Sequence, residues 1–231
     1  MVREQNIRSA ILRAALGDQD WAELLKSGRR LSFAKGQTII ARGSLADNLY
    51  VIESGRVEIS VTLADGNKAA LNQMGPGEVL GEIALLDGGP RSADAIAAST
   101  DVHLIAVSHA EIYRILEKSS DVLTALIREL CKRVRNASDM FEVKSEKSAE
   151  VRLARALLQL AAKWGRAGDG GPEGGTVIKG FSQSELGDLA GLARENVNRQ
   201  LRLWEDDALI RRDGKTIILC DPDAIAVAAQ L

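Results

Sequence analysis

Glycine and proline are distributed so unevenly along this chain that they limit what each part of it can form. Glycine recurs every few residues between Gly28 and Gly89, whereas neither glycine nor proline occurs from Arg91 to Trp164. A second glycine-rich segment then runs from Gly165 to Gly175. Frequent turn residues favour short strands, and a long stretch without them permits long helices. We therefore expect a β-rich part followed by helices.

The composition excludes several broad classes of protein. Of 231 residues, 45% are apolar and 27% are charged, and 30 Lys and Arg against 32 Asp and Glu leave a net charge of −2. This is an ordinary globular composition, and the length favours two domains. Because the charges balance, any nucleic-acid-binding surface must be local. Three Trp, two Tyr and three Phe are few for a protein that stacks single-stranded bases on exposed rings.

No feature of the sequence indicates secretion or membrane insertion. The N-terminal residues mix charges with Ile7, Ile11 and Leu12, and they lack the unbroken apolar segment of a signal peptide. No stretch approaches the ~18 apolar residues of a membrane span. Cys131 and Cys220 lie far apart and are expected to be reduced thiols. We expect a cytoplasmic protein with no membrane partner.

The β-rich part alternates in a way that predicts paired strands. Val57, Ile59 and Val61 are separated by Glu58 and Ser60, and a period of two is typical of a half-buried strand. Another apolar run precedes this strand across a glycine-containing turn, which indicates a hairpin. Several such strands in close succession predict a small antiparallel β barrel or roll.

From about residue 108 the apolar spacing changes to that of a helix. Six apolar residues of one long helix follow each other at intervals of 4, 3, 4, 3 and 4: Leu123, Ile127, Leu130, Val134, Ala137 and Phe141. A narrow stripe with this heptad spacing and strongly polar flanks is typical of a parallel homodimer seam. The alternative is a helix that packs the stripe on its own domain.

The C-terminal part carries the pattern of a winged helix-turn-helix. Ser182 with Glu185 is a capping box that starts one helix, and Gly191 ends that helix. A second helix runs from about residue 193 to 207, and a hairpin with an Asp-Gly turn covers residues 208–219. The predicted fold class is α+β, with an N-terminal antiparallel β-roll domain (1–118), a long dimerisation helix (119–146) and a C-terminal winged helix-turn-helix domain (147–231).

The second helix of this pattern presents polar residues opposite its apolar stripe, and in a helix-turn-helix it lies in the major groove. The arginine fork matches the two acceptors of guanine, and glutamate accepts from the amino group of cytosine. We therefore expect Arg194 and Arg199 to read guanines and Glu195 a cytosine, with Asn198 on the same face. Candidate phosphate ligands, which fix position without reading sequence, are Ser182, Gln183, Asn196, Arg212 and Lys215. The alternative is a solvated face with a weak helical ion pair.

One glycine-rich segment of the β-rich part predicts a site for a small anionic ligand. Gly81 permits close backbone approach, and residues 83–86 can form a helical turn whose N–H groups face an anion. Arg91 can bind a phosphate charge, Ser92 adds a hydroxyl donor, and Glu82 suits a ribose hydroxyl. The set fits a sugar phosphate of low charge, and no triphosphate motif is present. The alternative is an ordinary loop with a surface Glu–Arg pair. The candidate ligands of this segment are Gly81, Glu82, Ile83, Ala84, Arg91 and Ser92.

These two sets of residues resemble one known family. Gly-Glu-Ile-Ala-Leu at residues 81–85, followed by Pro-Arg-Ser-Ala at residues 90–93, is similar to the phosphate-binding cassette of the cyclic-nucleotide-binding domain. Arg-Glu-Asn-Val-Asn-Arg at residues 194–199 resembles the recognition helix of the bacterial cyclic-AMP receptor protein family. The resemblance covers about residues 30–225, and the two motifs in this order make it highly specific.

The resemblance implies a cytoplasmic, homodimeric transcription regulator that binds a cyclic nucleotide and, in response, palindromic TGTGA-like DNA sites. RNA polymerase is implied as a further partner. The resemblance assigns the ribose to Glu82, the cyclic phosphate to Arg91 and Ser92, and the base to Asn136 and Ser138 on the long helix.

Ala137 stands where that family has a purine-contacting threonine. The resemblance makes cyclic AMP the first candidate effector, but the missing hydroxyl at Ala137 leaves cyclic GMP, or binding of both nucleotides, open. The cysteine cluster of an oxygen-sensing branch is absent, and His103 and His109 are interpreted as structural, so no metal, haem or iron–sulfur cluster is expected. We expect no enzyme activity. Two other functions stay open: a cyclic-nucleotide sensor that acts through protein contacts, and a ligand-independent regulator of the same fold.

Overall fold

The structure is a computed structural model of the chain and describes residues 21–22, 24, 26–63, 66, 68–118, 120–145, 148–167 and 175–230. The chain divides into two compact units, Met1–Ala137 and Ser138–Leu231. The boundary between them falls inside the long helix that the sequence predicts at residues 119–146. Each unit has its own hydrophobic core and is described by itself.

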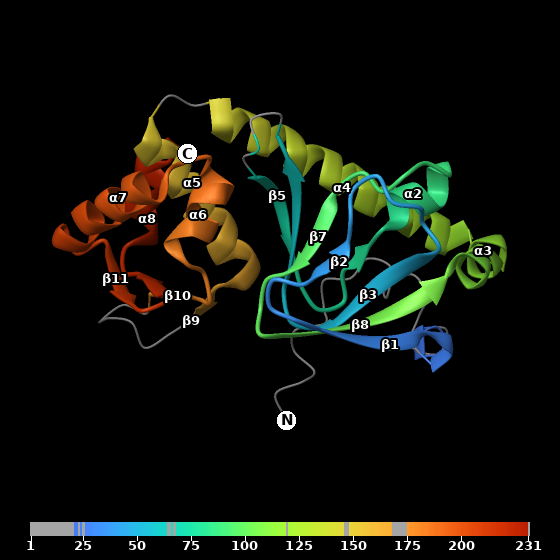
Figure 1. The fold of residues 1–231 in the computed structure, drawn as a ribbon. Coiled ribbons are helices and arrows are strands. Elements are labelled where there is room, and N and C mark those ends of the chain that lie inside the picture. The colour runs from blue at the N-terminus through green and yellow to red at the C-terminus, as the bar shows by residue number, and fades with distance from the viewer. Residues whose placement is uncertain are drawn as a thin grey trace. The chain divides into compact units, whose positions relative to one another are not determined.

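In the described part of the first unit, short antiparallel strands form two four-stranded sheets (Figure 1). One sheet has the order β1-β8-β3-β6 and the other the order β2-β7-β4-β5. The strands are β1 (Arg29–Ala34), β2 (Thr38–Ile40), β3 (Asn48–Ser54), β4 (Val57–Thr62), β5 (Lys68–Met74), β6 (Val79–Leu80), β7 (Asp94–Ala97) and β8 (Asp101–Ser108). This arrangement is the predicted β-roll.

Strand β4 differs from its predicted pattern of burial. Strict alternation places Val57, Ile59 and Val61 toward the core and Glu58 and Ser60 toward solvent. Instead, Glu58 is 3% and Ser60 1% exposed, while Ile59 and Val61 are only half-buried. One reason is a register irregularity between Ile59 and Ser60 in the pairing with β5. Another is that β5 offers polar partners for Glu58, namely Gln73 and Lys68, so that this carboxylate can be buried.

The buried carboxylate of β4 is compensated by polar neighbours on β5. Glu58 accepts a hydrogen bond of 3.1 Å from Nε2 of Gln73 and forms an ion pair with Lys68. A charge buried in this way is tolerated because it is both paired and hydrogen-bonded. The sequence reads Glu58 as a solvent-facing residue because spacing carries no information about a partner ten residues further along the chain.

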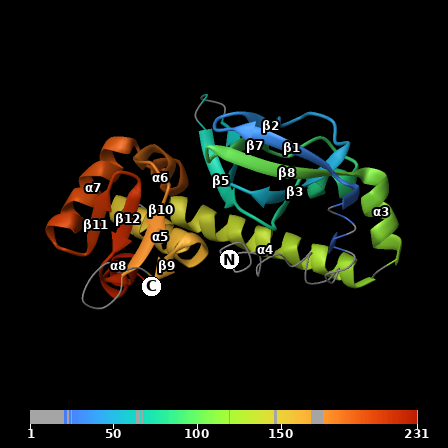
Figure 2. The same ribbon diagram turned by 90° about the horizontal axis from the view of Figure 1, so that it is seen from below.

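In the described part of the first unit, the helices α2 (Glu82–Asp87) and α3 (His109–Lys118) are followed by α4 (Ser120–Ser145), which contains the boundary to the second unit. Figure 2 shows α4 passing along one side of the two sheets. Its inward face carries Val122, Ala125 and Leu126, which are at most 4% exposed. Val122 joins the core that contains Ile112 of α3 and Leu49 of β3.

The stripe predicted at a dimer seam lies on the other face of α4. Leu123, Ile127 and Val134 are 43%, 52% and 67% exposed. Ala137 is also exposed, and Leu130 is half-buried. The side chain of Phe141 lies outside the described residues. The helix therefore has two apolar faces: the unpredicted one is buried in its own unit, and the predicted stripe is mostly exposed, although Leu130, Val134 and Ala137 line a cavity of this unit.

The second unit combines helices with a small sheet. Its elements are α5 (Ala149–Trp164), β9 (Arg166–Ala167), β10 (Thr176–Lys179), α6 (Gln183–Ala190), α7 (Arg194–Asp206), β11 (Ile210–Asp213), β12 (Thr216–Leu219) and α8 (Pro222–Ala228). The sheet has the order β11-β12-β10-β9. Leu157, Leu186, Val197 and Trp204 are among the residues that join the helices in one core.

The helix ends of this unit form where the sequence predicts them. Ser182 and Glu185 form both hydrogen bonds of the capping box at the start of α6. Gly191 ends α6 in the left-handed conformation with φ 64°. Helices α6 and α7 with the β11–β12 hairpin make the predicted winged helix-turn-helix, so the predicted α+β fold class is confirmed.

Among the described residues, no helix is long and apolar enough to cross a lipid bilayer. Within the described ranges, no three His, Cys, Asp or Glu side chains come together as metal ligands. His103 makes a contact of 2.9 Å with the hydroxyl of Ser32, and the ring of His109 packs on Tyr113 at 4.3 Å between centroids.

Candidate ligand pocket and DNA-binding surface

The first unit contains a cavity of about 320 Å³. Residues from both sheets, from the α2 segment and from α4 surround it: Ile40, Ile59, Leu71, Asn72, Met74, Leu80, Gly81, Glu82, Ile83, Ala84, Arg91, Ser92, Ala93, Ala95, Leu130, Arg133, Val134 and Ala137. Most of the lining is apolar, and the charged groups gather at the α2 end. A cavity of this size and mixture is typical of a small-molecule site.

Arg91 is one of two arginines that line this cavity, and its guanidinium is held firmly. Its side chain is 5% exposed. Nη1 donates to the carbonyl oxygen of Gly81 at 2.8 Å and Nη2 to that of Asn48 at 2.6 Å. The guanidinium carbon also lies 5.8 Å from the ring centroid of Tyr50. The two hydrogen bonds use two of the five N–H donors of a guanidinium, so the group keeps donors for an anion.

Gly81 is required by this arrangement. Its φ is +86°, a left-handed conformation that favours glycine. A Cβ atom built there would lie 2.2 Å from Nη1 of Arg91. Gly81 also stands at the N-cap of α2, where no side chain caps the helix. Because Gly81 has no side chain, the guanidinium of Arg91 can lie against the backbone at the start of α2.

Glu82 and Arg133 form a buried ion pair at the same end of the cavity. Glu82 is 2% exposed, and its Oε1 accepts from Nη1 of Arg133. Nη2 of Arg133 also donates to the carbonyl oxygen of Val79. Oε2 of Glu82 is buried and has no hydrogen-bond partner among the described residues. Such an oxygen is costly unless a ligand hydroxyl satisfies it.

The sequence misses Arg133. This residue flanks the apolar stripe of α4, next to Val134, and heptad spacing places it on a solvated flank. It is only 19% exposed because Glu82 and the β6 backbone attract its guanidinium inward. A signal was available in principle, since a glutamate predicted inside a ligand site needs a cation or a donor.

The other predicted ligand residues are only partly brought together. Ala84 is buried, Ile83 is 39% exposed, and Ser92 is exposed; all three line the cavity. The side chain of Asn136 lies outside the described residues. Ser138 belongs to the second unit and is not among the residues that line the cavity.

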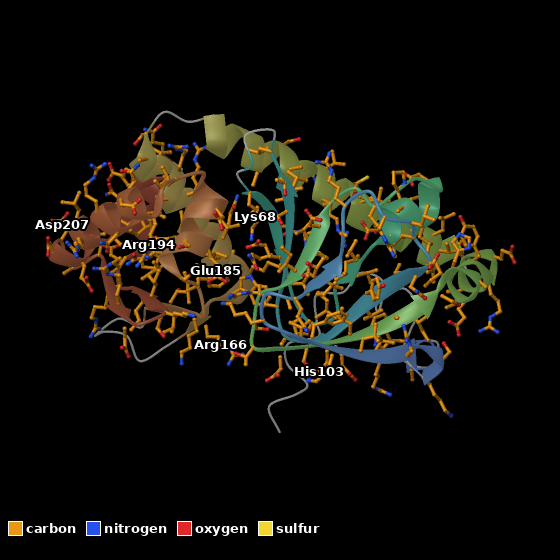
Figure 3. All side chains as sticks on the ribbon, viewed as in Figure 1. Lys68, His103, Arg166, Glu185, Arg194 and Asp207 are labelled. Carbon is orange, nitrogen blue, oxygen red and sulfur yellow. The ribbon has the colours of Figure 1, made fainter. Side chains whose placement is uncertain are left out.

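The second unit presents the predicted reading residues on the first half of α7. Arg194, Glu195 and Arg199 are exposed, and Asn196 is half-buried. Arg194 begins the helix and is labelled in Figure 3. Nη2 of Arg199 donates to Oδ1 of Asn196 at 3.2 Å. The sequence alone would also allow Arg199 to form a helical ion pair with Glu195. The three charged side chains thus point outward from one helical face.

The predicted phosphate ligands differ in their surroundings. Lys215 is exposed at the β11–β12 hairpin. The hydroxyl of Ser182 is engaged in the capping box. Gln183 donates from Nε2 to Oδ1 of Asn198 at 3.1 Å. The first contact lies within the start of α6, and the second joins α6 to α7.

Arg212, the remaining predicted phosphate ligand, is bound inside the unit. Its Nε donates to Oε2 of Glu205 at 2.9 Å, and its Nη1 donates to Oδ1 of Asn198 at 3.3 Å. The hydrogen-bonded guanidinium of Arg212 lowers the pKa of Glu205 below its usual value. The sequence misses this pairing because the two residues lie on different elements, α7 and β11.

Comparisons with known proteins agree with this geometry. Residues 30–119 match the cyclic nucleotide-binding domain family, and residues 151–227 match the Crp-like helix-turn-helix domain family. A CRP-like cAMP-activated global transcriptional regulator of Mycobacterium tuberculosis is 30% identical over 90% of this chain and 92% of its own length. The cyclic AMP receptor protein of Thermus thermophilus is 33% identical over 82% of both chains.

Solved structures show the same fold. A transcriptional regulator of the CRP/FNR family from Thermus thermophilus superimposes with a TM-score of 0.69 at 26% identity, over 88% of this chain and 99% of its own. FixK2 from Bradyrhizobium japonicum has a TM-score of 0.76 at 22% identity, over 87% and 96% of the two chains.

Proposed function

The chain belongs to the cyclic-AMP receptor protein family of transcription regulators, and we propose that it works as a homodimer that binds palindromic, TGTGA-like DNA in response to a cyclic nucleotide, cyclic AMP first. Its two domains are those of a transcription regulator and not of an enzyme. One observation carries the proposal. The cavity of the first unit joins a buried guanidinium to a buried carboxylate oxygen that has no partner among the described residues.

A purine 3′,5′-cyclic nucleotide offers one phosphate charge, one ribose hydroxyl and one flat base, and the cavity has groups suited to each. The phosphate would be bound by Arg91, with the hydroxyl of Ser92 as a second donor. The ribose hydroxyl would donate to Oε2 of Glu82. The base would lie among the apolar side chains, such as Leu71 and Val134. Neutral residues around the base and a single cation at the phosphate match the low charge of this ligand.

Cyclic AMP is the first candidate because the relatives from Mycobacterium tuberculosis and Thermus thermophilus carry it in their names. Ala137 lines the cavity and offers no hydroxyl to the edge of a purine. Selectivity for adenine over guanine must then come from other residues, so cyclic GMP belongs in the same experiment. Asn136 and Ser138 stay proposed base contacts.

The exposed stripe of α4 supports the homodimer. Leu123, Ile127 and Val134 repeat at heptad spacing and are exposed, and burying such a stripe against a second copy removes apolar surface from water. Two copies would place two recognition helices at half-sites about one DNA turn, ~34 Å, apart. RNA polymerase in the cytoplasm is the further partner that we propose.

DNA recognition is proposed for the outward face of α7. Arg194 and Arg199 would each donate two hydrogen bonds to a guanine, and Glu195 would accept from a cytosine. Lys215 would bind a phosphate. The ligand acts by a population shift: it must bind the DNA-competent state more tightly than the other state, because equal affinity would switch nothing.

The test is DNA affinity measured against both nucleotides. The full-length protein is titrated into a fluorescent palindromic duplex with two TGTGA half-sites, without nucleotide and with cyclic AMP, cyclic GMP or 5′-AMP as a non-cyclic control. We expect a cyclic nucleotide to raise the affinity, and we expect Arg194→Ala to abolish specific binding while calorimetry shows that nucleotide binding is retained.

Two results would reject the proposal in different ways. Equal DNA affinity of the wild type and Arg194→Ala would favour a sensor that acts through protein contacts. Specific DNA binding that neither cyclic nucleotide changes, together with no heat of binding, would favour a ligand-independent regulator.

A further inference from the structure

We propose that Asn198 reads DNA as a hydrogen-bond donor only, because Gln183 and Arg212 occupy its carbonyl oxygen. This inference rests on the DNA-binding function proposed above and adds to it the chemistry that one position of the half-site must have. It also gives Gln183 and Arg212 the role of positioning residues, where the sequence predicts phosphate ligands.

The orientation of the Asn198 amide follows from the chemistry of its neighbours. Oδ1 of Asn198 lies 3.3 Å from Nη1 of Arg212 and 3.1 Å from Nε2 of Gln183. A guanidinium has only donors, so the Asn198 atom that faces Arg212 must be the oxygen. Gln183 must then also present its NH₂ group. The alternative amide flip would set donors against a cation.

Arg212 is itself fixed. Its Nε and Nη2 donate to Oε2 of Glu205, and its backbone N–H donates to Oε1 of Glu205 at 3.2 Å. Glu205 lies on the same helix as Asn198, seven residues later, and Arg212 lies on β11. The network therefore joins α6, α7 and the β11–β12 hairpin at one point. The carboxylate of Glu205 balances the charge of Arg212, which weakens its attraction for a phosphate.

Asn198 lies on the DNA-facing side of α7. It follows Arg194 by four residues and Glu195 by three, and residues at these spacings are neighbours on a helix surface. It is half-buried, as expected for a side chain with one end held and the other end outward. With Oδ1 occupied, the group that remains for DNA is the NH₂ of Nδ2.

A donor-only amide selects different bases from an ordinary asparagine. A free asparagine pairs with both N7 and N6 of adenine, accepting one hydrogen bond and donating the other. A fixed NH₂ can use only acceptors, which guanine offers at O6 and N7 and thymine at O4; adenine offers N7 beside its own N6 donor, whereas cytosine offers only a donor. We therefore expect guanine or thymine to be preferred, and cytosine rejected, at the base that Asn198 faces.

The experiment compares base preference in four proteins. Full-length wild type, Asn198→Asp, Arg212→Met and Arg211→Met are titrated into a panel of palindromic duplexes, in saturating cyclic AMP and cyclic GMP in turn, with all four bases placed at each half-site position. Arg211→Met is the matched control. Arg211 is exposed on the same strand, and no hydrogen bond links its side chain to α7 among the described residues. Thermal melting verifies that each variant folds.

Asn198→Asp is the decisive variant because its carboxylate can still accept from Gln183 and Arg212 while the outward NH₂ is replaced by an acceptor. At one half-site position we expect the wild type to prefer guanine or thymine over cytosine by about tenfold or more. In Asn198→Asp this order should invert toward cytosine or adenine, which present amino donors. Preferences at all other positions should stay as in the wild type.

Arg212→Met tests the positioning role. Without the cation the Asn198 amide can turn over, so adenine should gain at the same position while the salt dependence of binding stays unchanged. A phosphate ligand would instead weaken binding to all sequences equally and reduce the slope of log K against log salt by about one. That result would overturn the inference, and so would identical base preferences in the wild type and Asn198→Asp. A wild type that binds no duplex of the panel would overturn both this inference and the proposed function.

Discussion

At the scale of single residues, the cavity presents the guanidinium of Arg91 in a fixed position. Arg91 donates to two backbone carbonyls, and no carboxylate pairs with it among the described residues. An anion that binds there does not have to order a long, mobile side chain, which would otherwise reduce affinity. The glycine that allows this placement is therefore as important to the site as the arginine.

Substitution of Gly81 separates these contributions. Gly81→Ala forces a Cβ atom toward Nη1 of Arg91, to 2.2 Å if nothing moves, and adds strain at φ +86°. We expect displacement of the guanidinium to lower the affinity for cyclic AMP by about tenfold or more. A tenfold fall corresponds to a loss of ~1.4 kcal/mol of binding free energy. Calorimetry measures the affinity.

Gly88→Ala is the control for Gly81→Ala. Gly88 also has a positive φ, +69°, but a Cβ atom there meets nothing within 4 Å. This variant should lose stability through strain of about 1 kcal/mol and keep its nucleotide affinity. Equal losses of affinity in the two variants would show that strain, and not the contact with Arg91, decides binding.

The Glu205–Arg212 contact makes the stability of the second unit depend on pH. Because hydrogen bonding to Arg212 lowers the pKa of Glu205 below its usual 4.5, the folded form binds fewer protons than the unfolded form in acid. The contribution is fully present above pH 4.5 and is lost as the pH falls through the lowered value. We expect wild type to be more stable than Glu205→Gln near neutral pH, and the difference to shrink below pH 4.5.

Chemical unfolding at several pH values measures this difference. The same comparison in an Arg212→Met background is the control, because Glu205 then loses the guanidinium that lowers its pKa most. A difference between the wild type and Glu205→Gln that stays constant from pH 7 to pH 3 would contradict the assignment.

The sequence predicts some residues of the candidate site and misses others for a physical reason. Gly81, Glu82 and Arg91 lie within one short segment, so their chemistry can be interpreted together. Arg133 comes from a helix far along the chain and is turned inward by Glu82. Contacts between distant segments follow from packing, which local spacing does not encode.

At the scale of elements, α4 has two apolar faces in different environments. Val122, Ala125 and Leu126 pack on the first unit, and Leu123 and Ile127 are exposed. The heptad pattern identifies the exposed face because that face is the narrower and more regular one. The packing face is shorter and merges with the polar flanks in the sequence, so periodicity alone does not reveal it.

Neighbouring residues of α4 provide a matched pair for testing the dimer. Ile127 is 52% exposed and Leu126 is 3% exposed. We expect Ile127→Asp to give folded monomers, because it places a charge in the seam and leaves the core intact. Leu126→Asp should instead unfold the first unit. Sedimentation gives the oligomeric state and circular dichroism the fold, and a dimeric Ile127→Asp protein would reject this seam.

In strand β4, the alternation of apolar and polar residues does not predict which side chains are buried. A period of two identifies the strand correctly and places Val57 in the core, but it does not show that Glu58 and Ser60 are also buried and that Ile59 lines the cavity. The winged helix-turn-helix is predicted more accurately, because caps and turns such as Ser182 and Gly191 are local signals.

At the scale of the whole molecule, two units with separate cores share one chain, and α4 contains the boundary between them. The proposed function requires that binding in the first unit changes the DNA affinity of the second. Such coupling is a single free energy that both ligands share. It can therefore be measured from either side.

We expect the factor by which cyclic AMP raises DNA affinity to equal the factor by which the palindromic duplex raises cyclic AMP affinity, typically about 5- to 150-fold. Anisotropy measures the first factor and calorimetry the second, at one protein concentration. Arg194→Ala should keep its basal nucleotide affinity and lose the increase caused by the duplex. A factor of one in both directions would contradict the coupling.

Val134 belongs both to the lining of the cavity and to the exposed stripe of α4. If a second copy covers that stripe, dimerisation and effector binding both involve the side chain of Val134. The two binding equilibria are then coupled. The effector concentration that half-saturates the regulator would then shift with the number of copies in the cell. Expression level would become a means of tuning sensitivity that needs no change in any residue.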